Sequence, residues 1–388
     1  MKIGLYICDI LYNTGGTEAY TVRLCQTLQS LYKDAEIYFV TECYGKSDVL
    51  SDSEFVDSIN VRFGTEIEKR GVHVKLMNAS QKSWGSRLFL RKKLECNSRF
   101  FDLFFYCSRG HYIFKAKKNV CIIHFPMERL ETLKKEKCFL TRVRLGAKSR
   151  KYAGQYDIFL PNSLFTKSFL SAIWYDIDED RQCVLYPPVK EIAPSSEPKR
   201  NQIFICSRIE KSKNLESLID AFKSSAFLMS NYKLVIAGGV PCCHKNYSQE
   251  LQSYAGGGNI EFVLNAPFST ISRLYNQSKI FWHSKGFGVD EKKDPFLCEH
   301  FGISTVEAMS AGCVPIVINK GGQKEIVDES CGFKWNTLSE LVSYTEAVAL
   351  DDELQMRLSR AAQERSKLFC MGSFRDNLES ILKNKGLL

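Results

Sequence analysis

Two carboxylates and a predicted helix start lie together in the segment EHFGISTVEAMSAG, residues 299–312. Glu299 ends an irregular stretch, Gly302 permits a tight turn, and the following residues predict a helix from Ser304 to Gly312. The first backbone N–H groups of a helix have no partner within it and attract anions. In this segment those groups would belong to Ile303, Ser304 and Thr305.

The two carboxylates suit the hydroxyl groups of a sugar. Glu299 precedes the predicted N–H groups, and Glu307 lies in the first turn of the helix. Carboxylates accept hydrogen bonds from hydroxyl groups, whereas backbone N–H groups suit a phosphate or a sugar oxygen. The combination indicates a site for a nucleotide sugar. The alternative is structural, because Ser304 and Glu307 also have the spacing of a capping box, which stabilises only the helix end.

Two cations follow the first predicted strand of the second half of the chain. Arg208 and Lys213 come directly after residues 202–207, and ligands bind at the carboxyl ends of parallel strands. Cations at that position could neutralise the charge that grows on a departing diphosphate. Taken singly, each could equally be an ordinary surface charge.

Two weaker signals lie in the first half. Gly15 and Gly16 follow the first predicted strand, where glycine lets the backbone approach a ligand in front of a helix. They are not part of a GxGxxG dinucleotide motif, and the alternative is a tight loop. His124 follows a later strand in the sequence His-Phe-Pro. It could lie at a ligand site, and the alternative interpretation is a histidine with a purely structural role.

The elements expected to position these residues form two similar halves. Short apolar runs alternate with helical periodicity, which is typical of parallel sheets covered on both faces. The strands are expected at residues 2–7, 36–40, 72–77, 102–106, 119–123 and 157–161, and then at 202–207, 232–237, 260–264, 280–283 and 314–318. Four of the ten prolines fall within residues 187–198, which predicts an extended linker between the halves. A ligand would bind in a cleft between them.

Composition excludes several other classes of protein. The 388 residues are 44% hydrophobic and 25% charged, which fits a folded protein of two domains. No apolar run has the length of a membrane span, and the N-terminus is a poor signal peptide. The 15 cysteines are scattered and have no CxxC spacing, so they are expected as thiols in a reducing compartment. No metal site is expected, because the histidines lack metal-site spacing and residues 176–180 read as a solvated acidic turn.

All of the net charge of +9 comes from the first half, since residues 1–190 hold 30 basic and 21 acidic side chains. The basic residues gather at 87–93, 115–118 and 134–151. A basic surface favours anionic partners such as lipid headgroups or a phosphorylated lipid carrier. The alternative is a set of solvated helix faces. Nucleic acid is not expected as a partner, because no recognition motif accompanies the charge.

The order of these signals resembles glycosyltransferase family 4, the retaining transferases of the GT-B fold. The series comprises Gly-Gly, His-x-Pro, Arg-x4-Lys and Glu-x7-Glu around His-Phe-Gly, and the resemblance is strongest over residues 281–327. It implies an α/β protein with two Rossmann-like, doubly wound domains facing a cleft. The expected parts are an acceptor-binding domain (1–190), a nucleotide-sugar-binding domain (191–370) and a C-terminal helix that returns to the first domain (371–388).

The resemblance also implies a role for each site residue. Arg208 and Lys213 would bind the diphosphate, and Glu299 would bind hydroxyls of the transferred sugar. His124 would lie near the 6-position of that sugar and contribute to catalysis, and Glu307 would hold the ribose hydroxyls. The other donor-binding residues would be Gly15, Gly16, Gly238, Leu264, Phe301, Gly302, Ile303 and Ser304.

Two features depart from the family pattern. The family often has Gly-Gly-x-Pro-Glu after the last core strand, whereas residues 321–325 are Gly-Gly-Gln-Lys-Glu, which puts the rigidity of this loop in question. Residues 285–298 are longer and more charged than in minimal members. Long forms of this segment occur in bacterial polysaccharide transferases and in the lipid-linked-oligosaccharide mannosyltransferase of eukaryotes.

The predicted function is transfer of a hexose from a nucleotide-diphosphate sugar to a glycan or lipid-linked acceptor in cell-surface polysaccharide synthesis. The anomeric configuration would be retained, and a mannose-type donor is slightly favoured. No metal or other cofactor is expected. The enzyme is expected in the cytoplasm, bound peripherally to the anionic inner face of the membrane. The alternatives are a GT-B sugar-nucleotide epimerase or hydrolase, and a catalytically dead nucleotide-sugar-binding protein.

Overall fold

The computed structural model describes residues 1–8, 10–12, 15–43, 50–78, 84–108, 114–126, 151, 153–173 and 177–387. Some residues of the sequence predictions fall outside these ranges, namely residues 13–14 before the glycine pair, most of the basic region at 134–151, and Asp176 of the acidic turn. The side chain of Arg87 also lies outside the described part of the chain.

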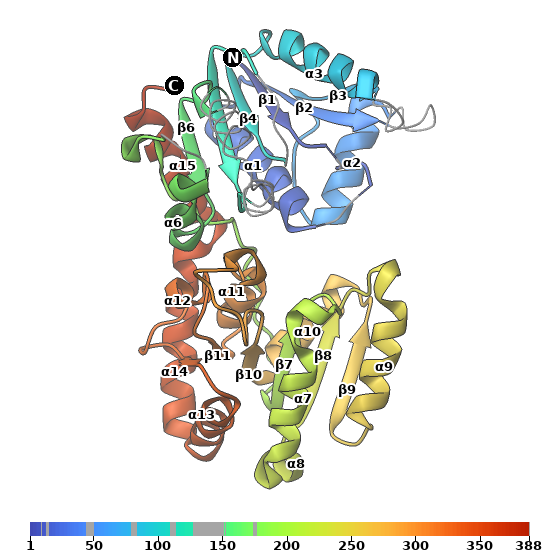
Figure 1. The fold of residues 1–388 in the computed structure, drawn as a ribbon, viewed down its shortest axis with the longest axis vertical. Coiled ribbons are helices and arrows are strands. Elements are labelled where there is room, and N and C mark those ends of the chain that lie inside the picture. Colours follow the sequence, from blue (N-terminus) through green and yellow to red (C-terminus); the bar gives the residue numbers. More distant parts are fainter. Residues whose placement is uncertain are drawn as a thin grey trace, which may run out of the picture. The chain divides into compact units, whose positions relative to one another are not determined.

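The chain folds into two compact α/β units (Figure 1). Unit 1 comprises Met1–Pro188 together with Met371–Leu388, and unit 2 comprises Val189–Cys370. The expected boundaries at 190/191 and 370/371 lie within two residues of these. The proline-rich segment therefore ends unit 1 and begins unit 2.

Unit 1 is built on a six-stranded sheet with the order β3-β2-β1-β4-β5-β6, in which every neighbouring pair is parallel. The strands are β1 (Lys2–Tyr6), β2 (Glu36–Cys43), β3 (Val72–Asn78), β4 (Leu103–Tyr106), β5 (Lys118–Ile123) and β6 (Ile158–Pro161). The chain order reverses between β1 and β4. This arrangement is the doubly wound Rossmann order.

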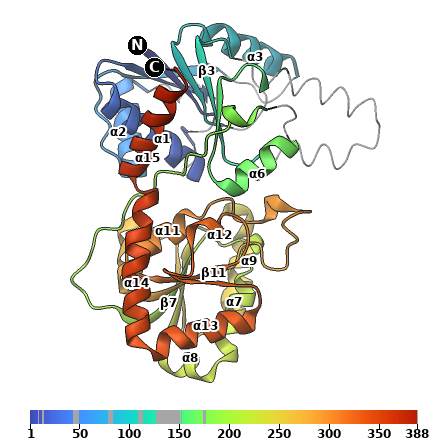
Figure 2. The same cartoon turned by 90° about the vertical axis from the view of Figure 1, so that its left-hand side faces the viewer.

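Helices cover both faces of this sheet, because both faces of its strands are apolar. Ile3 and Leu5 of β1 pack with helices α1, α2 and α15, whereas Tyr6 packs with α3 and α6 on the opposite face (Figure 2). The helices are α1 (Gly16–Leu31), α2 (Asp52–Phe63), α3 (Trp84–Ser98), α6 (Leu164–Ile173), the short 3₁₀ helix η2 (Glu179–Arg181) and α15 (Met371–Asn384). Helix α15 thus belongs to the core of unit 1, as the resemblance implied.

Unit 2 repeats the same topology. Its six-stranded parallel sheet has the order β12-β11-β10-β7-β8-β9. The strands are β7 (Arg200–Cys206), β8 (Lys233–Gly238), β9 (Ile260–Leu264), β10 (Ser278–His283), β11 (Val314–Ile318) and β12 (Phe333–Trp335). The order reverses between β7 and β10, where a doubly wound sheet opens its ligand crevice.

The faces of the second sheet are also both covered. Ile203 and Ile205 pack with α7, α9, α13 and α14, and Phe204 packs with α10 and α11 on the other face. The helices are η3 (Lys211–Lys213), α7 (Leu215–Ser224), α8 (Ala226–Asn231), η4 (Cys242–His244), α9 (Lys245–Ala255), α10 (Phe268–Gln277), η5 (Pro295–Leu297), α11 (Ile303–Ser310), α12 (Gln323–Ile326), α13 (Leu338–Leu350), α14 (Asp352–Ser366) and η6 (Lys367–Phe369).

The structure departs from the sequence prediction at several elements. Strand β12 was not predicted, and α11 begins at Ile303 and ends at Ser310 rather than spanning 304–312. Buried cysteines such as Cys25, Cys107 and Cys121 lie within the core as thiols. None of the helices in the described ranges is long and apolar enough to cross a membrane.

Candidate functional site

The candidate site of unit 2 lies where β7 and β10 end side by side. These strands are parallel neighbours at the reversal point of the sheet. The loop after β7 carries Arg208 and Lys213, and the chain after β10 carries the loop that leads to Glu299 and helix α11. The topology therefore brings residues about 90 positions apart in sequence to one edge of one sheet.

The loop after β7 is fixed by the end of β10. Lys213 ends the 3₁₀ turn η3, and Asn214 follows in the left-handed conformation with φ 50°. The hydroxyl of Ser284 donates to the carbonyl oxygen of Lys213 at 2.6 Å. Since this bond ties the backbone of Lys213 to the neighbouring strand, the direction of the Lys213 side chain is set by tertiary structure.

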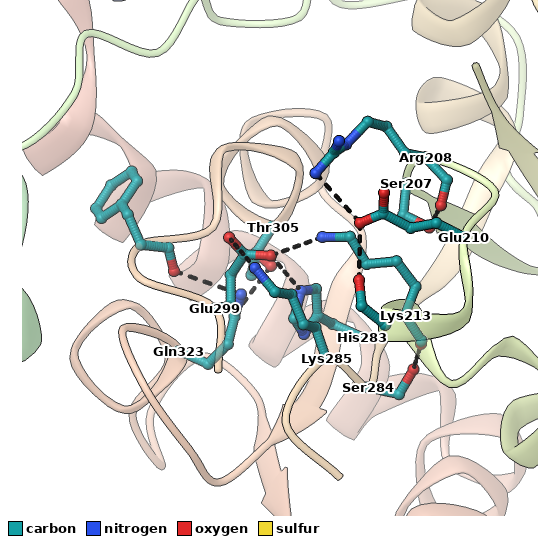
Figure 3. A network of polar contacts seen from close by, with 12 residues as sticks. Ser207, Arg208, Glu210, Lys213, His283, Ser284, Lys285, Glu299, Thr305 and Gln323 are labelled. Atoms are coloured by element: carbon teal, nitrogen blue, oxygen red, sulfur yellow. Dashed lines mark hydrogen bonds and ion pairs between the residues drawn. The ribbon is translucent and has the colours of Figure 1, made fainter. Parts of the chain in front are cut away.

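Glu299 is the centre of a cluster of charged groups (Figure 3). Its carboxylate lies 2.8 Å from Nζ of Lys213, 3.5 Å from Nε2 of His283 and 3.8 Å from Nζ of Lys285. The side chains of Lys213, Lys285 and Glu299 are 13%, 14% and 20% exposed. The structure therefore brings two of the predicted site residues, Lys213 and Glu299, into direct contact, and their roles at a donor stay predictions.

The surroundings of Glu299 determine the protonation states of the cluster. Burial alone would raise the pKa of Glu299, but the positive charges of Lys213 and Lys285 together hold it well below its ordinary value. Burial lowers the pKa of Lys285, and the Glu299 carboxylate opposes that effect only in part. Burial also lowers the pKa of His283. At neutral pH the cluster is thus an ionised carboxylate between lysines and a neutral imidazole.

Arg208 lies at the solvent side of the same network. Its guanidinium is 3.2 Å from Oε1 of Glu210, and the hydroxyl of Ser212 donates to the same carboxylate oxygen at 2.7 Å. The side chain of Arg208 is 66% exposed, whereas that of Glu210 is 13% exposed. Glu210 therefore holds a guanidinium whose outer face is open to a ligand.

Helix α11 begins four residues after Glu299. Its N-cap residue is Gly302 with φ 134°, and no side chain caps the helix. The capping-box alternative for Ser304 and Glu307 is therefore wrong. The prediction that the N–H groups of Ile303, Ser304 and Thr305 are all unbonded is wrong for Thr305, whose N–H donates to the carbonyl oxygen of Gly302 at 3.1 Å.

Glu307 lies one turn further along α11, and Tyr275 holds it. The phenolic hydroxyl of Tyr275 donates to Oε2 of Glu307 at 3.0 Å. Tyr275 is fully buried, and burial followed by the nearby Cys206 and Glu307 raises the pKa of its hydroxyl. Glu307 is thus fixed from α10 and forms a second carboxylate position, separate from the Lys213–Glu299 pair.

Gly238 lies where the ends of β7 and β8 approach most closely. A Cβ atom on Gly238 would be 1.7 Å from the carbonyl oxygen of Ser207, so only glycine fits. The N–H of Asn265, just after Leu264, donates to the carbonyl oxygen of Gly238 at 2.9 Å. The N–H of Val240 donates to Oδ1 of Asn265 at 2.9 Å. These bonds fix the backbone beside Arg208, around the predicted donor-binding residues Gly238 and Leu264.

Gly15, Gly16 and His124 belong to unit 1. Gly15 is the N-cap of α1, and a Cβ atom there would be 2.7 Å from Oε2 of Glu18. Gly16 is the first residue of α1. His124 follows β5, and its ring meets Tyr20 edge-on at a centroid distance of 5.2 Å. Their expected role at the donor stays a prediction.

Several residues of the site were missed by sequence reasoning. His283 ends β10 and Lys285 lies two residues further on, so a signal existed in their position at the end of a predicted strand. That signal becomes specific only when β10 is known to pair with β7. Tyr275 and Glu210 had no signal, because a buried tyrosine and a surface glutamate are common in any α/β protein.

The second unit matches a known family. Residues 190–365 match the sequence model of the family Glycosyl transferases group 1. The match covers nearly all of unit 2, Val189–Cys370.

Several curated relatives are mannosyltransferases of eukaryotes, and sucrose synthase 6 of Oryza sativa is another match. The GDP-Man:Man(3)GlcNAc(2)-PP-Dol alpha-1,2-mannosyltransferase of Dictyostelium discoideum is 23% identical over 58% of this chain and 47% of that protein. The alpha-1,3/1,6-mannosyltransferase of Rhizomucor pusillus is 25% identical over 55% of this chain and 54% of that protein. The chain spans about half the length, or less, of the curated relatives it matches.

Solved structures resemble the full chain. Anabaena HepE in complex with UDP and glucose superposes with a TM-score of 0.70 at 16% identity, over 99% of this chain and 100% of that one. WaaG, a glycosyltransferase involved in lipopolysaccharide biosynthesis, gives a TM-score of 0.65 at 13% identity, over 98% of both chains. The likeness confirms the expected fold, the GT-B fold built from two Rossmann-like units.

Proposed function

We propose that the protein is a retaining glycosyltransferase of the family 4 type, which moves a hexose from a nucleotide-diphosphate sugar to an acceptor hydroxyl. The observation that carries this proposal is the Lys213–Glu299 contact of 2.8 Å at the reversal point of the second sheet, next to the uncapped N-terminus of α11. Cations, a carboxylate and backbone N–H groups are the three kinds of partner that a diphosphate and its sugar need.

The cations would stabilise the departing nucleoside diphosphate. As the glycosidic bond breaks, negative charge grows on the phosphate oxygens, and preorganised donors there lower the barrier. The exposed guanidinium of Arg208 can reach a phosphate, and Lys213 can exchange its carboxylate partner for phosphate. Lys285 and His283 would then keep Glu299 ionised and in place, because both lie within 3.8 Å of its carboxylate.

Glu299 suits binding of sugar hydroxyls better than nucleophilic attack. A carboxylate that faces two lysines, and whose pKa is held well below its ordinary value, is a weak base and a weak nucleophile. Retention would therefore proceed by attack of the acceptor on the face that the diphosphate leaves, with the departing phosphate taking the proton of the acceptor hydroxyl. No metal ion or other cofactor enters this proposal.

Mannose is the favoured sugar, and a glycan or lipid-linked molecule is the favoured acceptor. The support is the set of curated relatives whose names give GDP-mannose as donor and a dolichol-linked oligosaccharide as acceptor. A role in cell-surface polysaccharide synthesis follows the sequence resemblance. In unit 1, His124 would contribute at the sugar, and Gly15 and Gly16 at the phosphates.

A sugar-nucleotide epimerase or hydrolase of the same fold, and an inactive nucleotide-sugar-binding protein, are the alternative functions. The deciding assay follows release of nucleoside diphosphate from GDP-mannose and UDP-glucose, with and without acceptor glycans. Release without acceptor would favour the epimerase or hydrolase. Binding of the nucleotide sugar without any release would favour the inactive protein.

The diphosphate assignment has its own variants. Arg208→Ala and Lys213→Ala should each lower turnover by about 10²–10³-fold, the usual cost of one lost charge-stabilising contact. Lys211→Ala is the matched control, because Lys211 lies in the same turn but faces the ring of Tyr247 at 6.0 Å. Turnover near the wild-type rate in both variants would exclude the assignment.

A peripheral location on the anionic inner face of the cytoplasmic membrane is proposed for unit 1. The cations of residues 115–118 contribute little to it, because Lys115, Lys117 and Lys118 pair with Glu95, Asp102 and Asp157. Helix α3 offers the better surface, with exposed Arg91 and Lys92 beside Phe89, which is 69% exposed.

Co-sedimentation with vesicles tests this location. Binding to anionic vesicles should weaken in Lys92→Glu and with added salt, since each exposed cation contributes about 1 kcal/mol. Equal binding to neutral and anionic vesicles would remove the proposal.

A further inference from the structure

The glycine pair Gly321–Gly322 lies directly against the backbone that carries Glu299. The N–H of Gly322 donates to the carbonyl oxygen of Glu299 at 2.7 Å. A Cβ atom on Gly321 would be 2.2 Å from that same oxygen, and one on Gly322 would be 2.4 Å from the carbonyl oxygen of His300. The position of this pair thus determines the position of residues 299–301.

The inner side of this contact is held by Gln323, which is fully buried. The hydroxyl of Thr305 donates to Oε1 of Gln323 at 2.9 Å, and Nε2 of Gln323 lies 3.5 Å from the carbonyl oxygen of Phe301. Gln323 occupies the space that a Cβ atom on Gly302 would need, at 2.2 Å. Figure 3 shows this side chain beside Thr305 and Glu299.

The outer side is held by the long loop that precedes Glu299. Glu291 accepts a hydrogen bond from the N–H of Gly321 at 3.1 Å and pairs with the ammonium group of Lys324. Lys320 donates in return to the carbonyl oxygen of Val289. The ammonium group of Lys324 and the N–H of Gly321 hold the pKa of Glu291 below its ordinary value against the effect of burial. Glu291 is therefore ionised as the partner of both groups at neutral pH.

We propose that residues 286–298 form a clasp in which Glu291 holds the Gly321–Gly322 backbone and thereby positions Glu299 against the transferred sugar. The clasp would take the place of the missing proline after the glycine pair, so the two departures from the family pattern would compensate each other. Glu291 and Gln323 are positioning residues, since they act through the backbone of the glycine pair and of residues 299–302. This inference rests on the proposed function, because it assigns the sugar to Glu299.

If the clasp positions Glu299, its loss should impair use of the nucleotide sugar much more than binding of the nucleoside diphosphate. In Glu291→Ala, kcat/KM for the nucleotide sugar should fall about 10–100-fold, the scale expected for a misplaced group. The inhibition constant of the nucleoside diphosphate should change less than about threefold, because Ser284 holds the backbone of Lys213 and Glu210 holds Arg208, and neither belongs to the clasp. Glu291→Gln should recover most of the loss, since the amide can still accept from Gly321. Lys292→Ala is the matched control, an exposed cation of the same loop.

Hydrogen exchange tests the clasp without any substrate. Exchange of the amides of residues 319–325 should speed up in Glu291→Ala and stay unchanged in Lys292→Ala. Unchanged exchange, wild-type kcat/KM, or equal losses for nucleotide sugar and nucleoside diphosphate would each overturn the inference. If Glu291→Ala does not fold, Glu291→Asp, whose shorter side chain withdraws the carboxylate from the N–H of Gly321, takes its place. If the wild-type protein turns over no nucleotide sugar, the proposed function fails, while the exchange result still decides the clasp.

Discussion

Replacing Lys285 with methionine should raise the stability of unit 2 and lower the turnover of a nucleotide sugar. Lys285 is 14% exposed, and burial lowers the pKa of its ammonium group. A lowered pKa means that the charged form is less favourable in the folded protein than in the unfolded chain. Methionine keeps the apolar stem and removes the charge, so the folded state loses an unfavourable contribution.

The opposing charges around Lys285 decide the size of this effect. At 3.8 Å from Glu299, the attraction amounts to about 4 kcal/mol with an effective dielectric constant of about 20. Burial and repulsion from Lys213 and Arg208 exceed that attraction, since the pKa of Lys285 is lowered despite it. The net gain expected in Lys285→Met is on the order of 1 kcal/mol, the usual scale of a single substitution. For a unit of this size it would raise Tm by about 2–4 °C.

The pH dependence of stability checks independently whether Lys285→Met stabilises the protein. Below the folded pKa of Lys285 the penalty is present in full. It fades as the pH rises toward 10.5, the ordinary value, because the unfolded chain then loses the same proton. The stability advantage of Lys285→Met should therefore be largest near neutral pH and shrink in alkaline solution.

Thermal unfolding at several pH values, beside release of nucleoside diphosphate, measures both halves of the prediction. Turnover should fall about 10²–10³-fold, because Glu299 loses a counter-ion and the diphosphate loses a nearby cation. Lys292→Met, an exposed site on the adjacent loop, should change neither quantity. A variant of Lys285 that is less stable and fully active would refute the reasoning, since the lysine would then be a purely structural counter-ion.

Three other substitutions have defined outcomes. Glu299→Gln should lower the free energy of unfolding at neutral pH, and its difference from wild type should shrink progressively as the pH falls from 4.5 toward the lowered pKa of Glu299 in the folded protein, because only the ionised form is stabilised. Tyr275→Phe should lower Tm by several degrees and weaken nucleoside diphosphate binding by about tenfold in calorimetry, since Glu307 loses a hydrogen bond worth about 1.5–3 kcal/mol that also fixes its position. Gly302→Ala should abolish turnover and lower Tm by several degrees because its Cβ would lie 2.2 Å from a buried amide, whereas Gly257→Ala, with open space at its Cβ, should lower Tm only slightly.

The sequence alone was sufficient to predict every strand of the two sheets except β12. Continuous apolar runs identify buried parallel strands, but the three residues of β12 (Phe333–Trp335) are too few to show any period. The sequence also singled out Lys213 and Glu299, which the structure brings into contact, because a motif with fixed spacing accompanied them. It was not sufficient for Lys285 and Tyr275, whose roles depend on which strands and helices become neighbours.

Local helix signals show the same limit. Ser304 and Glu307 have the spacing of a capping box, yet Gly302 is the N-cap and no side chain caps α11. At Ser51, the same spacing does form a capping box with Glu54. The difference comes from tertiary structure, because the backbone before α11 is fixed by contacts with Gln323 and the glycine pair rather than by its own first turn.

The position of α15 has a consequence for the order in which the chain can fold during synthesis. Phe374, Leu378 and Leu382 are buried in the core of unit 1, where the ring of Phe374 meets Tyr20 of α1 at 5.5 Å. Between Pro188 and these residues the ribosome must make the 182 residues Val189–Cys370. At about 5–20 residues per second this takes roughly 10–40 s. During that time the apolar face of unit 1 that packs against α15 stays exposed. Unit 1 is therefore completed only after unit 2 has been synthesised.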